Sequence, residues 1–217
     1  MKQREEKSTR LFDGVKTFKE QDFASVKDLF RDLEREQNPH TLFIGCSDSR
    51  VVPNLITHTL PGELFIIRNV ANLVPYYNQN HDNYLATSSA IEYAVNVLNV
   101  ENIIICGHSN CGGCRAIYAS ESKMKDLPMV KKWLELAYPV KAQVREKILK
   151  APSASCKRDE FTAQLNVVEQ MKHLLTFPYV KERYEAGDLN ILGWYYVIET
   201  GEVYNYLPVS EEFEKIE

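Results

Sequence analysis

The sequence predicts an α/β fold with a mainly parallel central β-sheet, one antiparallel edge strand and flanking helices. Residues 41–44 and 102–106 have the apolar, β-branched character of strands that are covered on both faces. Each run reaches a glycine and then a cysteine or histidine, and Gly107 is expected to let the backbone turn sharply. Helical stretches separate the strands, and Thr200-Gly201 forms a short hairpin between the last two. These observations predict reactive side chains at one edge of a parallel sheet.

The remaining elements follow from hydrophobic periodicity. Apolar residues recur every three to five positions between Leu11 and Glu36, which predicts two amphipathic helices with a break near Gln21-Asp22. Further helices are expected at 84–98, 115–120, 128–150 and 158–185, and further strands at 64–68, 190–199 and 202–207. Pro139 should kink or divide the helix that contains it, and Gly187 should end the next.

Composition limits the possible partners and compartment. The 217 residues suit one domain, and a hydrophobic content of 44% is enough for a sizeable core. The net charge of -4 gives no electrostatic footprint for nucleic acid, and no apolar run approaches the roughly 18 residues of a membrane span. The charged residues 1–7 are not followed by an apolar signal core, and the five cysteines are an odd number. We therefore expect a cytoplasmic protein without nucleic-acid or membrane partners.

Two strand ends supply a candidate metal site. If the two strands are neighbours in a parallel sheet, their ends bring Cys46, His108 and Cys111 together. Two thiolates and one imidazole favour zinc, and three protein ligands leave the fourth tetrahedral position open. Water in that position has its pKa lowered from about 15.7 to about 7, which gives hydroxide near neutral pH. The pattern therefore predicts catalytic zinc.

Other interpretations of the cysteines compete with zinc. A single free cysteine belongs more often to a core than to a metal site. The spacing of Cys111 and Cys114 also fits a redox pair of the C-x-x-C type. That interpretation leaves His108 and residues 46–50 unexplained. Cys114 could be a spare ligand, a redox liability or a buried residue, and the general tendency of free cysteine favours burial.

Charged and glycine residues around the candidate site suggest further roles. Asp48 and Arg50 lie two positions apart and could point from the same side of an extended backbone. An ordinary surface ion pair is worth about 0–1 kcal/mol, but beside a cation Asp48 could accept from bound water or become a fourth ligand, with Arg50 competing for it. Gly112 lies near a helix start, where free N–H groups can receive an anion. Arg68 could pair with carboxylates near the strand ends or be a surface cation.

Residues 46–50 and 107–113 closely resemble the motifs of the β-class carbonic anhydrases. Residues 61–65, 68–72 and 91–95 are similar to that family's intervening segments, so the resemblance covers most of the chain. It implies one zinc ion per subunit, held by Cys46, His108 and Cys111, and a dyad of Asp48 and Arg50. The activity that it implies is reversible hydration of carbon dioxide to bicarbonate and a proton by metal-hydroxide attack.

The resemblance also implies a shared substrate pocket and an assembly. Gln37, Phe65 and Tyr93 would line a mostly apolar pocket to which two subunits contribute. Residues 1–217 would form a single domain whose helical arm, residues 1–36, packs across a neighbour in a homodimer or homotetramer. An arm folded onto its own core explains the same periodicity. Two alternative functions are hydrolysis of carbon disulfide or carbonyl sulfide on the same zinc scaffold, and a non-enzymatic zinc-binding module.

Overall fold

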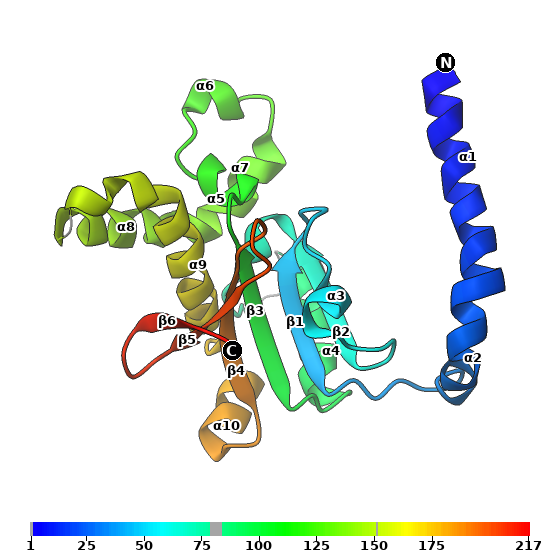
Figure 1. Ribbon diagram of the computed structural model, residues 1–217. Helices are drawn as coiled ribbons and strands as arrows, with labels where there is room; N and C mark the ends of the chain where they lie inside the picture. Colours follow the sequence, from blue (N-terminus) through cyan, green and yellow to red (C-terminus); the bar gives the residue numbers. More distant parts are fainter. Residues whose placement is uncertain (1, 79–83, 151) are drawn as a thin grey trace. The chain divides into compact units, whose positions relative to one another are not determined.

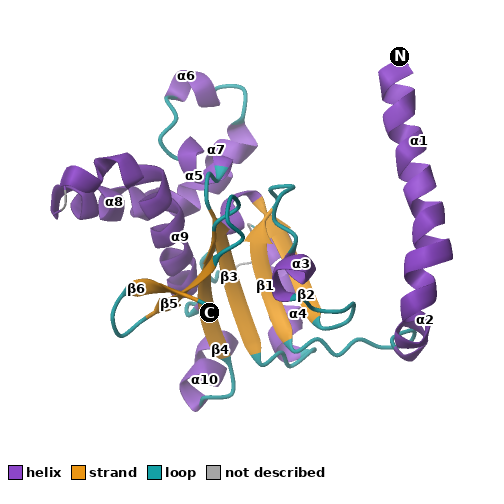
Figure 2. Ribbon diagram, in the orientation of Figure 1, coloured by secondary structure: helices purple, strands orange, loops and turns teal. Residues whose placement is uncertain are grey.

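The chain divides into two compact units, Met1–Asn38 and Pro39–Glu217. The computed structural model describes residues 2–78, 84–150 and 152–217, and Figures 1 and 2 show their helices and strands. The first unit is helical, whereas the second contains the whole β-sheet. In the part of the chain that the structure describes, no helix is both long and apolar enough to span a membrane.

The first unit contains α1 (Lys2–Thr17), the π-helical turn η1 (Phe18–Asp22) and α2 (Phe23–Asp32). The prediction of a break near Gln21-Asp22 was wrong, because the helical path continues through these residues. Instead, the Phe23 N–H bonds to the Phe18 carbonyl, and the two rings lie 6.1 Å apart. A five-residue spacing between contacting aromatic residues matches the hydrogen-bond period of a π-turn. The path does kink, but later: Val26 within α2 leaves the helical conformation, with φ -120° and ψ 17°.

The second unit is built on a six-stranded sheet with the order β2-β1-β3-β4-β5-β6 (Figure 1). Its strands are β1 (Thr41–Cys46), β2 (Leu64–Asn69), β3 (Asn102–His108), β4 (Asn190–Tyr196), β5 (Val203–Leu207) and β6 (Glu212–Lys215). The first four in spatial order are parallel, and β5 and β6 add antiparallel strands at one edge. The predicted α/β class is confirmed, although β6 was not predicted.

The register aligns the ends of the central strands. Gly45 of β1 pairs with Cys106 of β3, and Cys46 pairs with Asn69 of β2. Because these strands are parallel, their carboxyl ends meet at one edge of the sheet. Side chains that follow β1 and β3 are therefore neighbours in space, although more than 50 positions separate Cys46 from His108.

Helices of the second unit pack mainly beside this parallel part of the sheet. They are α3 (Pro53–Thr57), η2 (Val70–Asn72), α4 (Leu85–Asn96), α5 (Gly112–Ala116), α6 (Glu121–Met124), α7 (Pro128–Leu134), η3 (Glu135–Ala137), α8 (Tyr138–Lys150), η4 (Pro152–Lys157), α9 (Arg158–Leu174) and α10 (Pro178–Ala186). The predicted division near Pro139 is confirmed, since a 3-10 turn ends at Ala137. The single helix predicted at 158–185 was wrong, because Pro178 begins a new helix in the first turn, where its missing N–H costs nothing. Gly187 ends α10 with φ 81°, as expected.

The core lies on both faces of the parallel strands. On one face, Leu42, Ile44, Ile103 and Ile105 pack with apolar residues of α4, α9 and α10. On the other face, a smaller cluster is formed by Phe43, Ile104 and Cys106 together with partly buried side chains of β4. Alternate residues of β1 and β3 thus point to opposite layers, which explains their unbroken apolar sequences.

Candidate metal centre

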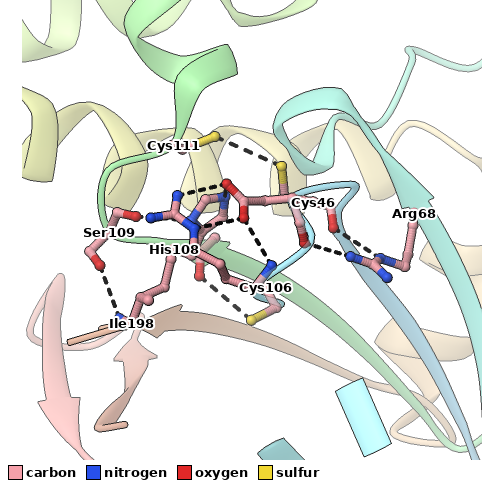
Figure 3. A network of polar contacts seen from close by, with 10 residues as sticks. Cys46, Arg68, Cys106, His108, Ser109, Cys111 and Ile198 are labelled. Carbon is pink, nitrogen blue, oxygen red and sulfur yellow. Dashed lines mark hydrogen bonds and ion pairs between the residues drawn. The ribbon is translucent and has the colours of Figure 1, made fainter. Parts of the chain in front are cut away.

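Three metal-binding side chains meet at the carboxyl ends of β1 and β3. Cys46 ends β1, His108 ends β3, and Cys111 immediately precedes α5. Their ligand atoms all lie within 4.8 Å of one another, and the two Sγ atoms are 3.9 Å apart (Figure 3). Two sulfur atoms about 2.3 Å from a tetrahedral zinc ion lie about 3.8 Å apart. The predicted convergence of these residues is therefore present in the geometry.

Gly107 positions the histidine in a different way from the one expected. Gly107 remains within β3 rather than turning the chain, and the strand ends only at His108. A Cβ atom on Gly107 would lie 2.6 Å from Cγ2 of Val167 and 3.2 Å from the carbonyl oxygen of Ala163. Both neighbours belong to α9, so this glycine permits close packing of α9 on the strand. The close packing that Gly107 permits thus fixes the position of the strand end that carries His108 relative to α9.

A hydrogen bond to the backbone fixes the ring of His108. Nδ1 lies 2.9 Å from the Ser109 carbonyl oxygen, and because a carbonyl can only accept, Nδ1 carries the hydrogen. Nε2 then presents its lone pair, and this fully buried atom has no hydrogen-bond partner among the described residues. Ser109 is itself held by two bonds. The Ile198 N–H donates to its Oγ at 3.0 Å (Figure 3), and its own N–H donates to the Tyr196 carbonyl at 2.9 Å. Sequence analysis missed this orienting role of Ser109.

The burial and the raised pKa values of the Cys46 and Cys111 thiols favour a cation bound between them. Cys46 and Cys111 are 6% and 2% exposed. The hydrogen bond with Cys111, followed by burial, raises the pKa of the Cys46 thiol to about 12. A hydrogen bond with Cys114, followed by burial, raises the pKa of Cys111 to about 12. Two thiolates at this separation repel each other, and a divalent cation between them and the lone pair of His108 removes that penalty. The donor set therefore fits a zinc ion.

Asp48 and Arg50 form a bidentate ion pair beside the cysteines. Nε of Arg50 donates to Oδ1 of Asp48 at 2.9 Å, and a terminal guanidinium nitrogen donates to Oδ2 at 2.8 Å. The backbone N–H of Arg50 also donates to Oδ1 at 3.0 Å. Hydrogen bonds from Arg50 hold the pKa of the Asp48 carboxyl well below its usual range, against an opposing effect of burial. Oδ2 of Asp48 lies 3.9 Å from Nε2 of His108, so the carboxylate borders the candidate metal site while the arginine holds it.

Arg68 binds backbone rather than a carboxylate. Its Nε donates to the Cys46 carbonyl at 3.1 Å, and a terminal nitrogen donates to the Asp48 carbonyl at 2.6 Å (Figure 3). Neither of the two roles that the sequence suggested, a partner of carboxylates or a free surface cation, describes these contacts. The guanidinium instead ties the end of β2 to the turn that carries Cys46 and Asp48, which limits the movement of both side chains.

The remaining predicted site residues occupy different places. Gly112 begins α5 directly after Cys111. Phe65 and Tyr93 lie together, with ring centroids 5.9 Å apart. Phe65 pairs with Leu42, four positions before the metal end of β1, which is roughly 13 Å along a strand. Phe65 and Tyr93 therefore lie next to each other but far from the cysteines of the same chain.

Gln37 and Cys114 complete the predicted set. Gln37 follows α2 in an exposed, non-helical part of the first unit, and its role in substrate binding stays a prediction. Cys114 is 3% exposed and belongs to an apolar cluster with Ala71, Leu73 and Ile117, which confirms the expected burial. Among the described residues, the group that could hold a metal ion consists of the three predicted ligands and does not include Cys114.

Comparisons with known proteins agree with this geometry. A protein-family model described as carbonic anhydrase matches residues 41–203. A carbonic anhydrase of Helicobacter pylori (strain J99) is 41% identical over 211 residues, which cover 95% of this chain and 93% of that protein. The structure of the β-carbonic anhydrase CcaA has a TM-score of 0.86 and 38% identity, covering 96% of this chain and 99% of the other. A structure from a report on two tetrameric β-carbonic anhydrases of Sordaria macrospora has a TM-score of 0.66 and 29% identity, with coverage of 94% and 95%.

Proposed function

This chain belongs to the β-carbonic anhydrase family, whose members interconvert carbon dioxide and bicarbonate, and we propose that it does so with zinc held by Cys46, His108 and Cys111. The observation that carries the proposal is the buried Nε2 lone pair of His108, which meets two buried sulfur atoms and has no other partner among the described residues. Bound there, zinc would supply hydroxide near neutral pH as the nucleophile for carbon dioxide.

The chain's own residues would orient the reaction. Arg50 holds Asp48 in place, and the Oδ2 atom of Asp48 lies close enough to the histidine to accept a hydrogen bond from a nucleophile at the open metal position. Because its pKa is lowered, Asp48 stays ionised and remains an acceptor at neutral pH. The N–H of Gly112, at the start of α5, is placed beside the ligand Cys111 and would receive the developing bicarbonate. Arg68 holds the backbone of this turn, which keeps the Asp48 carboxylate in place as a hydrogen-bond acceptor.

A closed, purely structural zinc site is less well supported. Such sites commonly use four protein ligands. Among the described residues, three side chains converge as possible ligands. The carboxylate beside them, that of Asp48, is hydrogen-bonded to Arg50. The arrangement therefore supports catalysis at an open position rather than the non-enzymatic module.

We also propose that the substrate pocket forms between subunits. Phe65 and Tyr93 pair with each other at a distance from the cysteines of their own sheet, and Tyr93 is 44% exposed. A second copy could place this aromatic pair, and Gln37, over its neighbour's metal. The tetrameric relatives from Sordaria macrospora support a homo-oligomer, either a dimer or a tetramer. The cytoplasmic location, the absence of nucleic-acid and membrane partners, and residues 1–217 as one domain with an arm at 1–36 stay predictions.

Metal analysis combined with stopped-flow hydration of carbon dioxide tests the metal assignment. The purified protein should contain about one zinc per subunit and should be active. Cys46→Ala, His108→Ala and Cys111→Ala should each lose the metal and the activity. Cys114→Ala is the matched control, since it removes a buried thiol beside Cys111 but should keep the zinc. Full zinc occupancy in any of the three ligand variants would exclude that residue as a ligand.

Subunit mixing tests the shared pocket. A Cys46→Ala chain lacks metal but keeps its aromatic pair, whereas a Tyr93→Ala chain keeps metal but lacks the pocket tyrosine. If two subunits share each site, mixing and reassembling the two inactive proteins should restore activity, because one site of each mixed dimer has both components. Light scattering on the same samples reports their assembly. A monomeric and fully active parent protein would contradict this proposal.

A further inference from the structure

Residues 69–74, which we call the spacer, lie between two elements that carry metal ligands. On one side, the Ser47 N–H donates to the Asn69 carbonyl at 2.9 Å, directly after Cys46. On the other side, a Cβ atom on Gly113 would lie 2.8 Å from Cβ of Ala71 and 3.2 Å from its backbone nitrogen. Gly113 follows Cys111 by two positions at the start of α5. The spacer therefore lies between the residue that follows Cys46 and the helix that begins directly after Cys111.

The backbone of the spacer adopts an unfavourable conformation. Ala71 has φ 64° and ψ 25°, and Asn72 has φ 49°, both in the left-handed region that favours glycine. Both residues are fully buried. Successive left-handed residues other than glycine persist only where the surroundings impose the conformation, and such strain is concentrated at functional sites.

Two buried amides of α9 hold the spacer, in addition to Asn69, whose side chain bonds to both backbone groups of Leu73. Nδ2 of Asn166 donates to the Ala71 carbonyl at 2.9 Å, and Oε1 of Gln170 accepts the Val74 N–H at 2.8 Å. Gln170 also donates from Nε2 to Oδ1 of Asn166 at 3.1 Å, so the two amides form one unit. Asn166 is 1% exposed and Gln170 is 0% exposed. Their contacts to the spacer span 95 and 96 positions of sequence.

We propose that Asn166 and Gln170 are positioning residues for the metal centre, because they hold the spacer that sets the separation between Cys46 and Cys111. Apolar residues of similar volume would fill the same space without the cost of burying two amides. What the amides add is a fixed position for the Ala71 carbonyl and the Val74 N–H. This inference rests on the proposed metal site and adds the means by which its two thiols are kept at the separation that zinc needs.

Near-isosteric apolar variants test the proposal. Asn166→Leu and Gln170→Met keep side-chain volume but remove the hydrogen bonds to the spacer. Each should weaken zinc binding by about 10- to 100-fold in competition with a chelator, as loss of supporting contacts around metal ligands typically does. The visible absorption of the cobalt-substituted protein should also change, because it reports the geometry of the ligands. Val180→Ala, which removes core volume from α10, is the control for general destabilisation and should leave the cobalt spectrum unchanged.

A second pair of variants changes the contact between Gly113 and Ala71 on the other side of the spacer. These variants test the proposal even if the amide variants do not fold. Gly113→Ala places a methyl group against Ala71 and should weaken zinc binding. Ala71→Gly in the same chain removes the methyl group that would lie 2.8 Å away and should restore part of the affinity.

The outcomes separate this inference from the proposed function. A parent protein without zinc would overturn the metal site itself. A parent that binds zinc, with folded amide variants of equal affinity and identical cobalt spectra, would overturn only the positioning role. Failure of Ala71→Gly to recover any affinity in the Gly113→Ala chain would also count against the spacer. If Val180→Ala weakened zinc binding as much as the amide variants do, general loss of stability would explain the effect and the positioning role would be wrong.

Discussion

Two histidine–carboxylate pairs in this molecule are built alike but differ in their surroundings. His108 and His173 are both fully buried, and Nδ1 of each donates to a backbone carbonyl, at 2.9 and 2.7 Å. Nε2 of each lacks a hydrogen-bond partner among the described residues and faces a carboxylate oxygen, of Asp48 at 3.9 Å and of Glu169 at 3.5 Å. Both carboxyl groups have a lowered pKa.

The neighbours of the two pairs separate function from structure. The thiols of Cys46 and Cys111 lie beside His108, and Arg50 donates hydrogen bonds to Asp48. Around Glu169 stand Gln143, which donates at 2.8 Å, and Lys172 at 3.5 Å, while the Tyr76 ring lies 3.8 Å from that of His173. A shifted pKa beside a buried histidine is therefore not sufficient to mark an active site. The two additional soft side chains distinguish the candidate metal centre from the second pair.

Arg50→Ala should have the largest effect, on activity. Without the guanidinium, Asp48 is free to turn toward His108 and close the remaining metal position. Hydration should fall by about a thousandfold at neutral pH, in the middle of the range that one positioned acid–base group contributes, while zinc content stays at about one per subunit. Part of the activity should return as pH rises, because hydroxide then competes better with the carboxylate. The measurement is zinc content beside the pH–rate profile.

Asp48→Asn is the matched variant, because it keeps the shape of the side chain but removes the competing charge. It should also keep zinc and lose activity, without recovery at high pH. Wild-type activity of Arg50→Ala across the whole pH range would mean that Asp48 and Arg50 form an ordinary surface ion pair.

Glu169→Gln should lower stability rather than activity. The neighbouring His173 imidazole, whose Nε2 lies 3.5 Å from the carboxylate, lowers the pKa of the Glu169 carboxyl from 4.5 to about 2, assisted by Gln143 and opposed by burial. One pKa unit corresponds to about 1.4 kcal/mol, so the ionised carboxylate contributes on the order of 3 kcal/mol at neutral pH. Urea unfolding at pH 7 should show a loss of this order, and zinc content should not change. Loss of zinc would contradict the structural role assigned to the second pair.

The pH dependence of this contribution has a definite direction. Because the pKa in the folded protein is below that of the unfolded chain, the stabilisation is complete above about pH 4.5 and disappears as pH falls toward about 2. The difference in unfolding free energy between the parent and Glu169→Gln should therefore shrink across that range. Lys172, His173 and Tyr76 are the other titratable groups that face this carboxylate. A difference that stays constant down to pH 2 would show that the carboxylate charge is not the source.

Lys172→Ala should have the smallest effect. The lysine side chain is 61% exposed and its nitrogen lies 3.5 Å from Oε2 of Glu169. Solvent screens such a pair, so we expect a loss of less than about 1 kcal/mol in unfolding free energy. A loss as large as that of Glu169→Gln would mean that the lysine, rather than the buried histidine and Gln143, holds the charge.

The sequence predicted what local patterns specify. The strand–glycine–ligand pattern predicted the meeting of Cys46, His108 and Cys111, because parallel strands bring their carboxyl ends to one edge. Contacts between distant residues left no such signal: Gln170 reads as one more polar residue in an amphipathic helix until its bond to Val74, 96 positions away, is seen. The division of helix 158–185 was missed although Pro178 marks it, because the apolar periodicity continues on both sides. The short strand β6 was missed because residues 212–215 are mostly charged.

The anchoring of Ser109 has a consequence for the order in which the protein is made. All three candidate ligands are complete once residue 111 has been synthesised, yet the bond that fixes Ser109 comes from Ile198, 89 positions later. β4, which completes the neighbouring edge of β3, also belongs to the last part of the chain. A growing chain thus carries every metal donor long before the imidazole is fixed in its final orientation. If these residues hold zinc as proposed, we expect coordination to reach its native geometry only after the last parallel strand has joined the sheet.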